Sequence, residues 1–274
     1  VATLISGAIV NAKLGVALAA EEKAYVSALG IGVSFSMANS SDPAGGTGWT
    51  AAVAGAGSAA VNELDNAVTS LIAAGSTVSS PGAVKVDALD DIEVVGVAGT
   101  VAIALGLGSE KTSSGGATAA IAVGAAVVKT DIGGNGGHSV ASSITGSIVS
   151  SEESNITVAA KSTASLYTLA AGGSGSYADG GQSSGSTTGS FAGAGVGVDN
   201  TIVQTISAAI TGGSAIASEG NVAVTATDSS AVTADAGAVA VALAIGQRTA
   251  AGAGSVGVAI ALNSLQTDVL ASVE

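Results

Sequence analysis

The stretch ITGGSAIASEGNVAVTATDSSAVTADAGAVAVALAI, residues 210–245, contains the plan that the rest of the chain repeats. After a glycine-containing turn it passes through Ile216 and a second turn into an alternating segment of Val222, Val224 and Ala226. Small or polar residues separate these three side chains, and a period of two indicates a strand with one buried face. The stretch therefore predicts turns and strands.

The same frame occurs three more times upstream. Its anchor residues are Val10, Val78, Val149 and Ile216, about 67–71 positions apart. The strands that follow these anchors begin at Val16, Val84, Ile156 and Val222. We therefore interpret the chain as one array of four imperfect units, approximately residues 1–68, 69–140, 141–206 and 207–274.

Each unit continues into long alternating runs. In the first unit, large residues from Leu29 to Met37 share one face, and Gly and Ser occupy the positions between them. The small face is expected to pack closely against another sheet or another chain, because a solvated strand face would carry Lys, Glu, Thr or Gln. The sheets are thus expected to be slender, with very small outward side chains. The third unit departs most from the pattern, since residues 166–177 are mostly Gly, Ser and Ala.

The length of a unit bears on how it folds. About 70 residues is long for one coil of a solenoid, so we expect two or three coils in each unit. Neither end of the array carries an obvious polar cap, which favours continuation or head-to-tail assembly.

The composition predicts a thin core. Aromatic residues make up 2% of the chain, with one Trp and two Phe, and charged residues make up 10%. A typical soluble domain has roughly 25% charged residues. A core without large side chains suits closely packed sheets or a narrow solenoid better than a globule.

The charge and the cysteine count exclude several classes of protein. A formal net charge of −13 repels nucleic acid and anionic lipid. No cysteine is present, so disulfides and thiolate metal sites are excluded. Ser, Thr or Gly interrupts every apolar run, so no membrane-spanning helix is expected. Any export signal is expected to lie outside this sequence.

The plan resembles a known group of proteins. Each unit has a short V-x-V-x-A strand, an acidic corner, an Ala/Gly/Val run, a Gly/Ser loop and a V-x-V-x-N strand, as in Val222, Val224, Ala226, Val258 and Asn263. This order is similar to that of the repeats of large bacterial filamentous adhesins. These are the filamentous-haemagglutinin-like and leukotoxin-type filamentous adhesins. The resemblance implies a β-solenoid, export to the cell surface, and a structural or adhesive role. It implies no catalytic residue.

The acidic residues are the candidates for a cation site. The pairs Glu21/Glu22 and Asp90/Asp91 and the single Asp228 fall at equivalent positions, with Ser162 in the remaining unit. We interpret them as solvated turns. The weak calcium candidates are Asp90, Asp91, Asp131 and Asp228. Asp131 begins a glycine-rich segment, residues 131–137, that we interpret as a flexible connector. No cofactor is expected otherwise.

Two further residue types are interpreted as structural. His138 lies in GGNGGHS without a second His or Cys and is expected on a surface loop. Asn62, Asn200 and Asn263, with Lys129 in the second unit, close the V-x-V-x-N strands, and Asn at a corner can bond the backbone of a turn.

An enzyme is not expected. Glycoside cleavage by a carboxylate pair would need an aromatic-lined cleft, and Trp49, Tyr167 and Tyr177 are scattered in the sequence. The sequence predicts an extracellular structural protein, either a filament subunit or an adhesin stalk, that stacks on itself end to end or laterally. A carbohydrate- or host-surface-binding module is the first alternative, and a polysaccharide-modifying β-helix enzyme the second.

Overall fold

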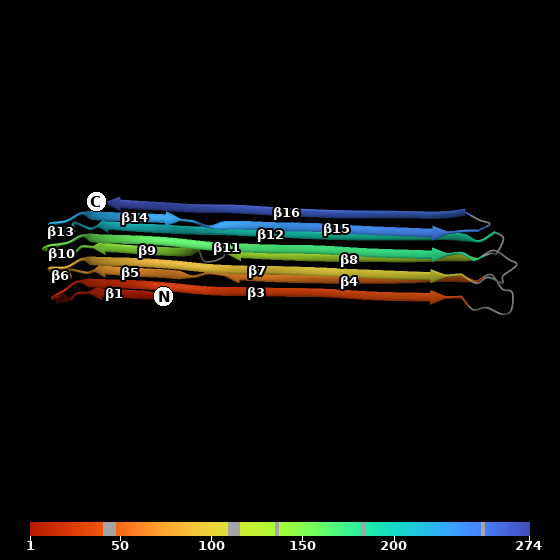
Figure 1. Ribbon diagram of the computed structural model, residues 1–274, viewed down its shortest axis with the longest axis horizontal. Helices are drawn as coiled ribbons and strands as arrows, with labels where there is room; N and C mark the ends of the chain where they lie inside the picture. Colours follow the sequence, from red (N-terminus) through yellow and green to blue (C-terminus); the bar gives the residue numbers. More distant parts are fainter. Residues whose placement is uncertain (41–47, 109–115, 135–136, 182–184, 248–249) are drawn as a thin grey trace.

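The computed structural model describes residues 1–40, 48–108, 116–134, 137–181, 185–247 and 250–274. Every regular element in these residues is a β-strand, and the strand pairs are parallel (Figure 1). The expected all-β class is therefore confirmed, and the parallel sheets are compatible with the expected solenoid.

The strands form three sheets. The β12 sheet contains β1 (Ala2–Ser6), β4 (Trp49–Leu64), β5 (Ala67–Ala73), β8 (Ala117–Ile132), β9 (His138–Thr145), β12 (Thr187–Thr211) and β16 (Ala250–Val273). The β7 sheet contains β3 (Val16–Asn39), β7 (Val84–Leu107), β11 (Ile156–Asp179), β14 (Val222–Asp228) and β15 (Ala231–Ile245). The cap sheet contains β2 (Ile9–Asn11), β6 (Thr77–Ser80), β10 (Ile148–Ser151) and β13 (Ala215–Ser218). The two long sheets lie face to face, and the cap sheet joins them at one end (Figure 1).

Each repeat makes a single circuit of the three sheets. The second circuit, for example, runs from β6 through β7 and β8 to β9, and the third begins at β10. The expectation of two or three coils in each unit is wrong. Strands of 24 residues, such as β7, span roughly 80 Å at about 3.3 Å per residue, so two long runs and a cap strand use the whole repeat.

The register of the sheets matches the sequence repeat. Val10 pairs with Val78, Val78 with Val149, and Val149 with Ile216 in the cap sheet. In the β7 sheet, Val16, Val84, Ile156 and Val222 occupy one position in four successive strands. The equivalence of these anchors is therefore confirmed, and four circuits stack in one direction.

The core differs along the length of the strands. We call residues 84–95 and 130–145, with their counterparts in the other circuits, the cap half, and residues 96–107 and 117–129, with theirs, the far half. The cap half has an aliphatic core that includes Val86, Ile92, Ile144, Ile156 and Ile206. The interior of the far half is mostly alanine, with Val128, Val196 and Val198 at its border with the cap half.

Small side chains let the two long sheets approach closely in the far half. An added Cβ at Gly106 would lie 2.7 Å from the carbonyl oxygen of Ala119, and one at Gly32 would clash with that of Gly57. Sheets with ordinary side chains pack about 10 Å apart. The expectation that the small face packs against another sheet is therefore confirmed, and the partner is a sheet of the same chain.

Serine and glycine form the corners between the β12 sheet and the cap sheet. The hydroxyl groups of Ser76 and Ser214 donate hydrogen bonds to carbonyl oxygens three residues earlier. The turn also needs left-handed residues: the turn before β10 has one, Gly146 (φ 55°), and the longer turn before β6 has two, Ala74 (φ 56°) and Gly75 (φ 71°). The turn before β13 likewise has two, Gly212 and Gly213 (φ 69° each). Glycine adopts this conformation at little cost, whereas alanine is strained there.

Candidate functional site

The acidic pairs predicted as solvated turns lie instead inside the long strands β3 and β7, and Asp228 is the last residue of the short strand β14. Glu22 of β3 pairs with Asp90 of β7, Asp90 with Ser162 of β11, and Ser162 with Asp228 of β14. Their predicted equivalence is confirmed, but their predicted setting is wrong. Successive members are one strand spacing apart, about 4.8 Å. Asp90 and Ser162 are fully buried between the sheets.

A second polar row lies opposite, on the β12 sheet, and pairs with the first. Asn66 donates to the carboxylate of Glu22, and His138 Nε2 lies 2.9 Å from Asp90 Oδ2. In the third circuit the Ser162 hydroxyl donates to Gln204 Oε1 at 3.1 Å and to Asp90 Oδ2 at 3.4 Å. These bonds connect the two rows across the middle of an apolar core.

The row continues into the fourth circuit. Gln204 Nε2 donates to the hydroxyl of Ser230 at 3.0 Å, and that hydroxyl donates to Asp228 Oδ1 at 2.6 Å. The polar row therefore runs through all four circuits at one position along the strands. Because a buried polar side chain is costly unless it is hydrogen-bonded, the row fixes how the two sheets face each other.

His138 is not on a surface loop, and that expectation is wrong. It begins β9, is 1% exposed, and points into the core toward Asp90. The glycine-rich sequence around it concealed this, because the period-two pattern starts only at His138 itself. Among the described residues, His138 Nδ1 and Asp90 Oδ1 have no hydrogen-bond partner.

The asparagines also form an internal row and do not close strands at corners. Asn62, Thr130, Asn200 and Asn263 are in register on the β12 sheet, so Thr130 and not Lys129 is the member in the second circuit. Asn200 Nδ2 donates to Asn263 Oδ1 and to Thr168 Oγ1, each at 2.8 Å. These bonds tie circuits and sheets together, and not the backbone of turns.

The four calcium candidates do not converge. Asp90 is held by His138, and Asp228 accepts bonds from the backbone and hydroxyl of Ser230. Asp131 Oδ2 lies 3.8 Å from Lys129 Nζ at the end of β8, and Asp91 is exposed on the outer face of β7. Among the described residues, no three His, Cys, Asp or Glu side chains gather as metal ligands would. Asn135 and Gly136 of the glycine-rich segment lie outside the described residues.

A polar hollow of about 240 Å³ on the cap half brings together Lys23, Tyr25, Asp91 and Glu93. Lys23 Nζ lies 2.8 Å from Glu21 Oε1, and this hydrogen bond raises the pKa of Lys23. Sequence reasoning missed the group because its members come from two circuits. The predicted scattering of Trp49, Tyr167 and Tyr177 remains, since Trp49 begins β4 and both tyrosines lie on β11.

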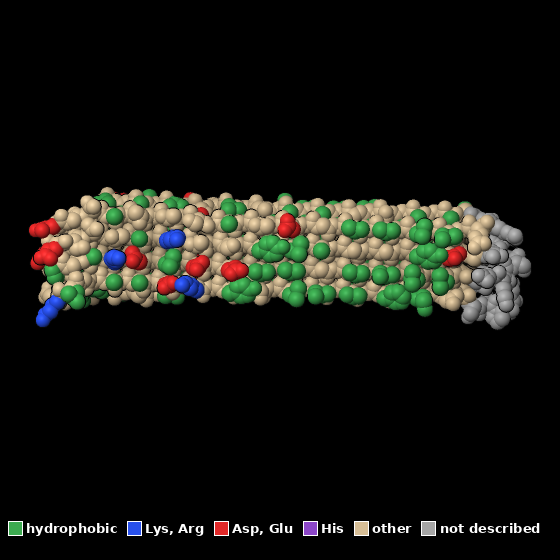
Figure 2. All heavy atoms as spheres, viewed as in Figure 1, with side chains coloured by type: hydrophobic (Ala, Val, Ile, Leu, Met, Phe, Trp, Pro, Cys, Tyr) green, Lys and Arg blue, Asp and Glu red, His purple; other side chains and the backbone are tan. Residues whose placement is uncertain are grey.

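The outer faces of the far half are apolar, contrary to the expectation of very small outward side chains. Leu29, Ile31, Val33, Phe35 and Met37 are 61–75% exposed on β3. Figure 2 shows charged side chains gathered mostly over the cap half and hydrophobic ones over the far half. The small face is the inner one, so the large face is turned to solvent.

Both ends of the stack expose strand edges. At one end lie β1, β2, β3 and β4, and at the other β13, β14, β15 and β16. The described residues contain no helix with the length and hydropathy to span a membrane. The chain matches no protein family, no curated protein and no solved structure.

Proposed function

We propose that the chain is a segment of a β-solenoid that serves as an extracellular structural protein, a filament subunit or adhesin stalk, by stacking end to end. The support is architectural. Four circuits pair in parallel and in register, so the last circuit offers a following copy the same cross-section that each circuit offers the next. The resemblance to filamentous adhesin repeats supports the location and the class.

The observation that carries the proposal is the length of the open edges. β3 has 24 residues at one end of the stack, and β16 has 24 at the other. Each edge presents a row of unpaired backbone N–H and C=O groups, which is a template for pairing with another chain. Proline, which would block such pairing, is absent from both strands.

The register sets one geometric condition on stacking. Ile5 pairs with Ile72, Ile72 with Ile144, Ile144 with Ile210, and Ile210 with Val273. Ile5 and Val273 are therefore equivalent positions, and the two terminal segments of adjoining copies would occupy the same place. One of them must leave its sheet before a second copy can pair along the full edge.

Electron microscopy of the purified chain, with fibre diffraction, tests the proposal. We expect filaments with a rise of about 19 Å per chain, four strand spacings of about 4.8 Å. Removing residues 1–6 should lengthen the filaments, because it clears the overlap. Ser34→Lys should abolish them, since an inward-pointing charge on edge strand β3 opposes pairing. Particles that stay single at every concentration, or that bind a glycan without stacking, would contradict the proposal.

A further inference from the structure

The outward rows of the β7 sheet in the far half form a flat apolar surface without charge at its centre. The row of Val33 continues with Val101, Gly173 and Val239, and the row of Phe35 with Ile103, Gly175 and Val241. These rows and their neighbours from Ile31 to Met37 contain no charged residue. The uncharged rows cover roughly 23 Å by 19 Å, or about 440 Å², from strand dimensions. The flanking rows carry Asp235 and Asp179 at the rim, and with them the face measures about 700 Å².

A groove runs along this surface over the third circuit. Its floor is Ala171, Gly173 and Gly175 on β11, and its walls are the side chains of β7 and β15, such as Ile103 and Val241. An added Cβ at Gly175 would meet nothing within 4 Å. The inward glycines are needed because the opposite sheet is close, whereas this outward glycine is not needed for packing within the chain.

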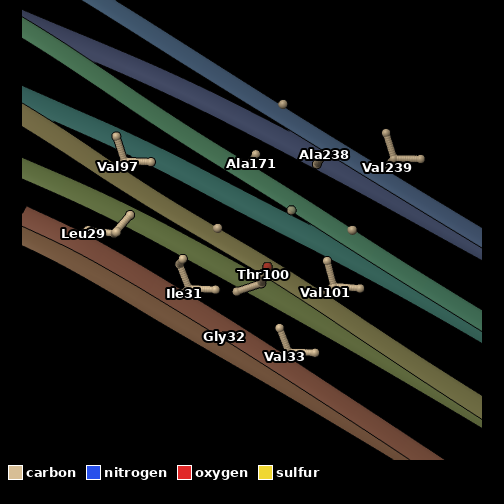
Figure 3. Close-up of a pocket in the computed structure, with 14 residues that line it drawn as sticks. Leu29, Ile31, Gly32, Val33, Val97, Thr100, Val101, Ala171, Ala238 and Val239 are labelled. Atoms are coloured by element: carbon tan, nitrogen blue, oxygen red, sulfur yellow. The ribbon is translucent and has the colours of Figure 1, made fainter.

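A depression of about 730 Å³ crosses the groove (Figure 3). Gly99, Ala171 and Gly237 form its floor, and Val97, Val101 and Val239 rise beside it. An added Cβ at Gly99 or at Gly237 would also meet nothing within 4 Å. The surface therefore has ridges of Val, Ile and Leu on β7 and β15 and a glycine groove on β11, the strand between them.

The chemistry and the spacing of this surface favour one occupant. A glycan needs polar partners, and the central rows offer only apolar side chains and Tyr177. An anionic chain is also repelled by an anionic lipid surface. A second copy of the chain carries ridges that are one strand wide, as the groove is, so a ridge of one copy fits the groove of another. The face, with its rim rows included, is close to the roughly 800 Å² per partner of a stable interface, and an apolar centre with a polar rim is the usual arrangement of such interfaces.

We propose that the far half of the β7 sheet is a lateral interface between two copies of this chain, in which a Val/Ile ridge of one copy lies in the glycine groove of the other. Packing faces together buries side chains that are now 39–75% exposed, such as Ile103 and Val33. Because the interface uses a face and not a strand edge, it does not depend on end-to-end stacking.

The test measures self-association by sedimentation equilibrium in the Ser34→Lys background, which removes edge pairing but leaves the outer face unchanged. We expect a dimer in this background. Gly175→Val fills the groove and should weaken the dimer roughly 10- to 100-fold. The fold should be retained, because valine is favoured over glycine in a strand. Thermal unfolding of each variant checks this.

The matched control is Gly197→Val on the outer face of the β12 sheet. Gly197 lies between Val127 and Ile260, as Gly175 lies between Ile103 and Val241, and an added Cβ there also meets nothing within 4 Å. Its dimer should remain within about twofold of the background. Ile103→Thr, which shortens a ridge, should weaken association in the same way as Gly175→Val.

Three results would overturn the inference. One is a dimer that is unchanged or tighter in Gly175→Val, as general hydrophobic aggregation predicts. Another is an equal loss in Gly197→Val, which would place the contact on the other face. The third is binding of the background protein to phosphatidylcholine vesicles with loss of the dimer, which would make lipid the occupant. Filaments of the unsubstituted chain can form or fail independently of each result.

Discussion

The cap half and the far half of the same strands have opposite arrangements of large and small residues. In β7, Val86 and Ile92 point inward in the cap half, where Lys85 and Asp91 point outward. Further along the strand, Ala102 and Ala104 point inward while Val101 and Ile103 point outward. One continuous strand thus changes from an ordinary soluble pattern to an inverted one without a break in its hydrogen bonding.

The difference shows that the two halves of the same strands are stabilised in different ways. The cap half buries aliphatic side chains, each of which contributes roughly 1.5–3 kcal/mol when fully buried. The far half buries mainly alanine, so its stability depends more on backbone pairing and on the close approach of the two sheets. Its large side chains remain available for contacts outside the circuit.

The largest expected effect comes from a substitution in the buried polar row of the cap half. His138→Ala removes the closer partner of Asp90 and leaves this buried carboxyl group with only the 3.4 Å bond from Ser162, which should cost about 3–5 kcal/mol in the free energy of unfolding. Denaturant titration measures this. The double variant Asp90→Ser with His138→Gln reproduces the Ser162–Gln204 pair of the third circuit and should recover most of the loss. A harmless His138→Ala would show that the pair does not matter.

A substitution on the far half tests the close approach of the sheets. Gly106→Val places its Cβ 2.7 Å from the carbonyl oxygen of Ala119, and should cost at least about 3 kcal/mol because backbone must move. The matched control is Gly99→Val, on the same strand but facing outward, where an added Cβ meets nothing within 4 Å. Its stability should stay equal or rise by up to about 1 kcal/mol. Equal losses in the two variants would refute the inward and outward assignment.

A stabilising substitution is available at a corner of the cap half. Ala74 has φ 56° and precedes the left-handed Gly75, whereas in the turn of the same length before β13 both positions are glycine, Gly212 and Gly213. Ala74→Gly should raise the midpoint of thermal unfolding and stabilise the fold by about 1 kcal/mol, because it relieves a left-handed alanine. Gly212→Ala is the reverse control and should lower the midpoint. A decrease in stability for Ala74→Gly would contradict the turn geometry.

The smallest expected effect concerns the outer face of the cap half. Desolvation raises the pKa of Asp87 above 3.8, and Lys85 partly opposes this. A raised carboxyl pKa in the folded state contributes stability at low pH, which is lost as the pH rises through the folded pKa. Asp87→Asn should therefore stabilise the protein at pH 7 by a few tenths of a kcal/mol after solvent screening, and not at pH 3. Unfolding at the two pH values distinguishes this from a pH-independent effect.

The sequence predicted the strands, the anchor register and the packing of the small faces, because alternation and repetition are local signals. The inside and the outside of the far half could not be predicted in the same way. The usual expectation places large apolar residues such as Phe35 inside, yet two sheets joined at the cap can close only if one face of each is small. His138 and Asp90 were missed as a pair because they come from different sheets, 48 residues apart.

The single-circuit repeat has a consequence for how the length of such a protein can change. Duplication or loss of one repeat in the gene would add or remove one layer, about 4.8 Å, while every other layer keeps its neighbours and its cross-section. Recombination between homologous segments could thus vary reach in small, even increments. Selection could adjust the outer side chains of each layer separately, since they do not take part in closing it.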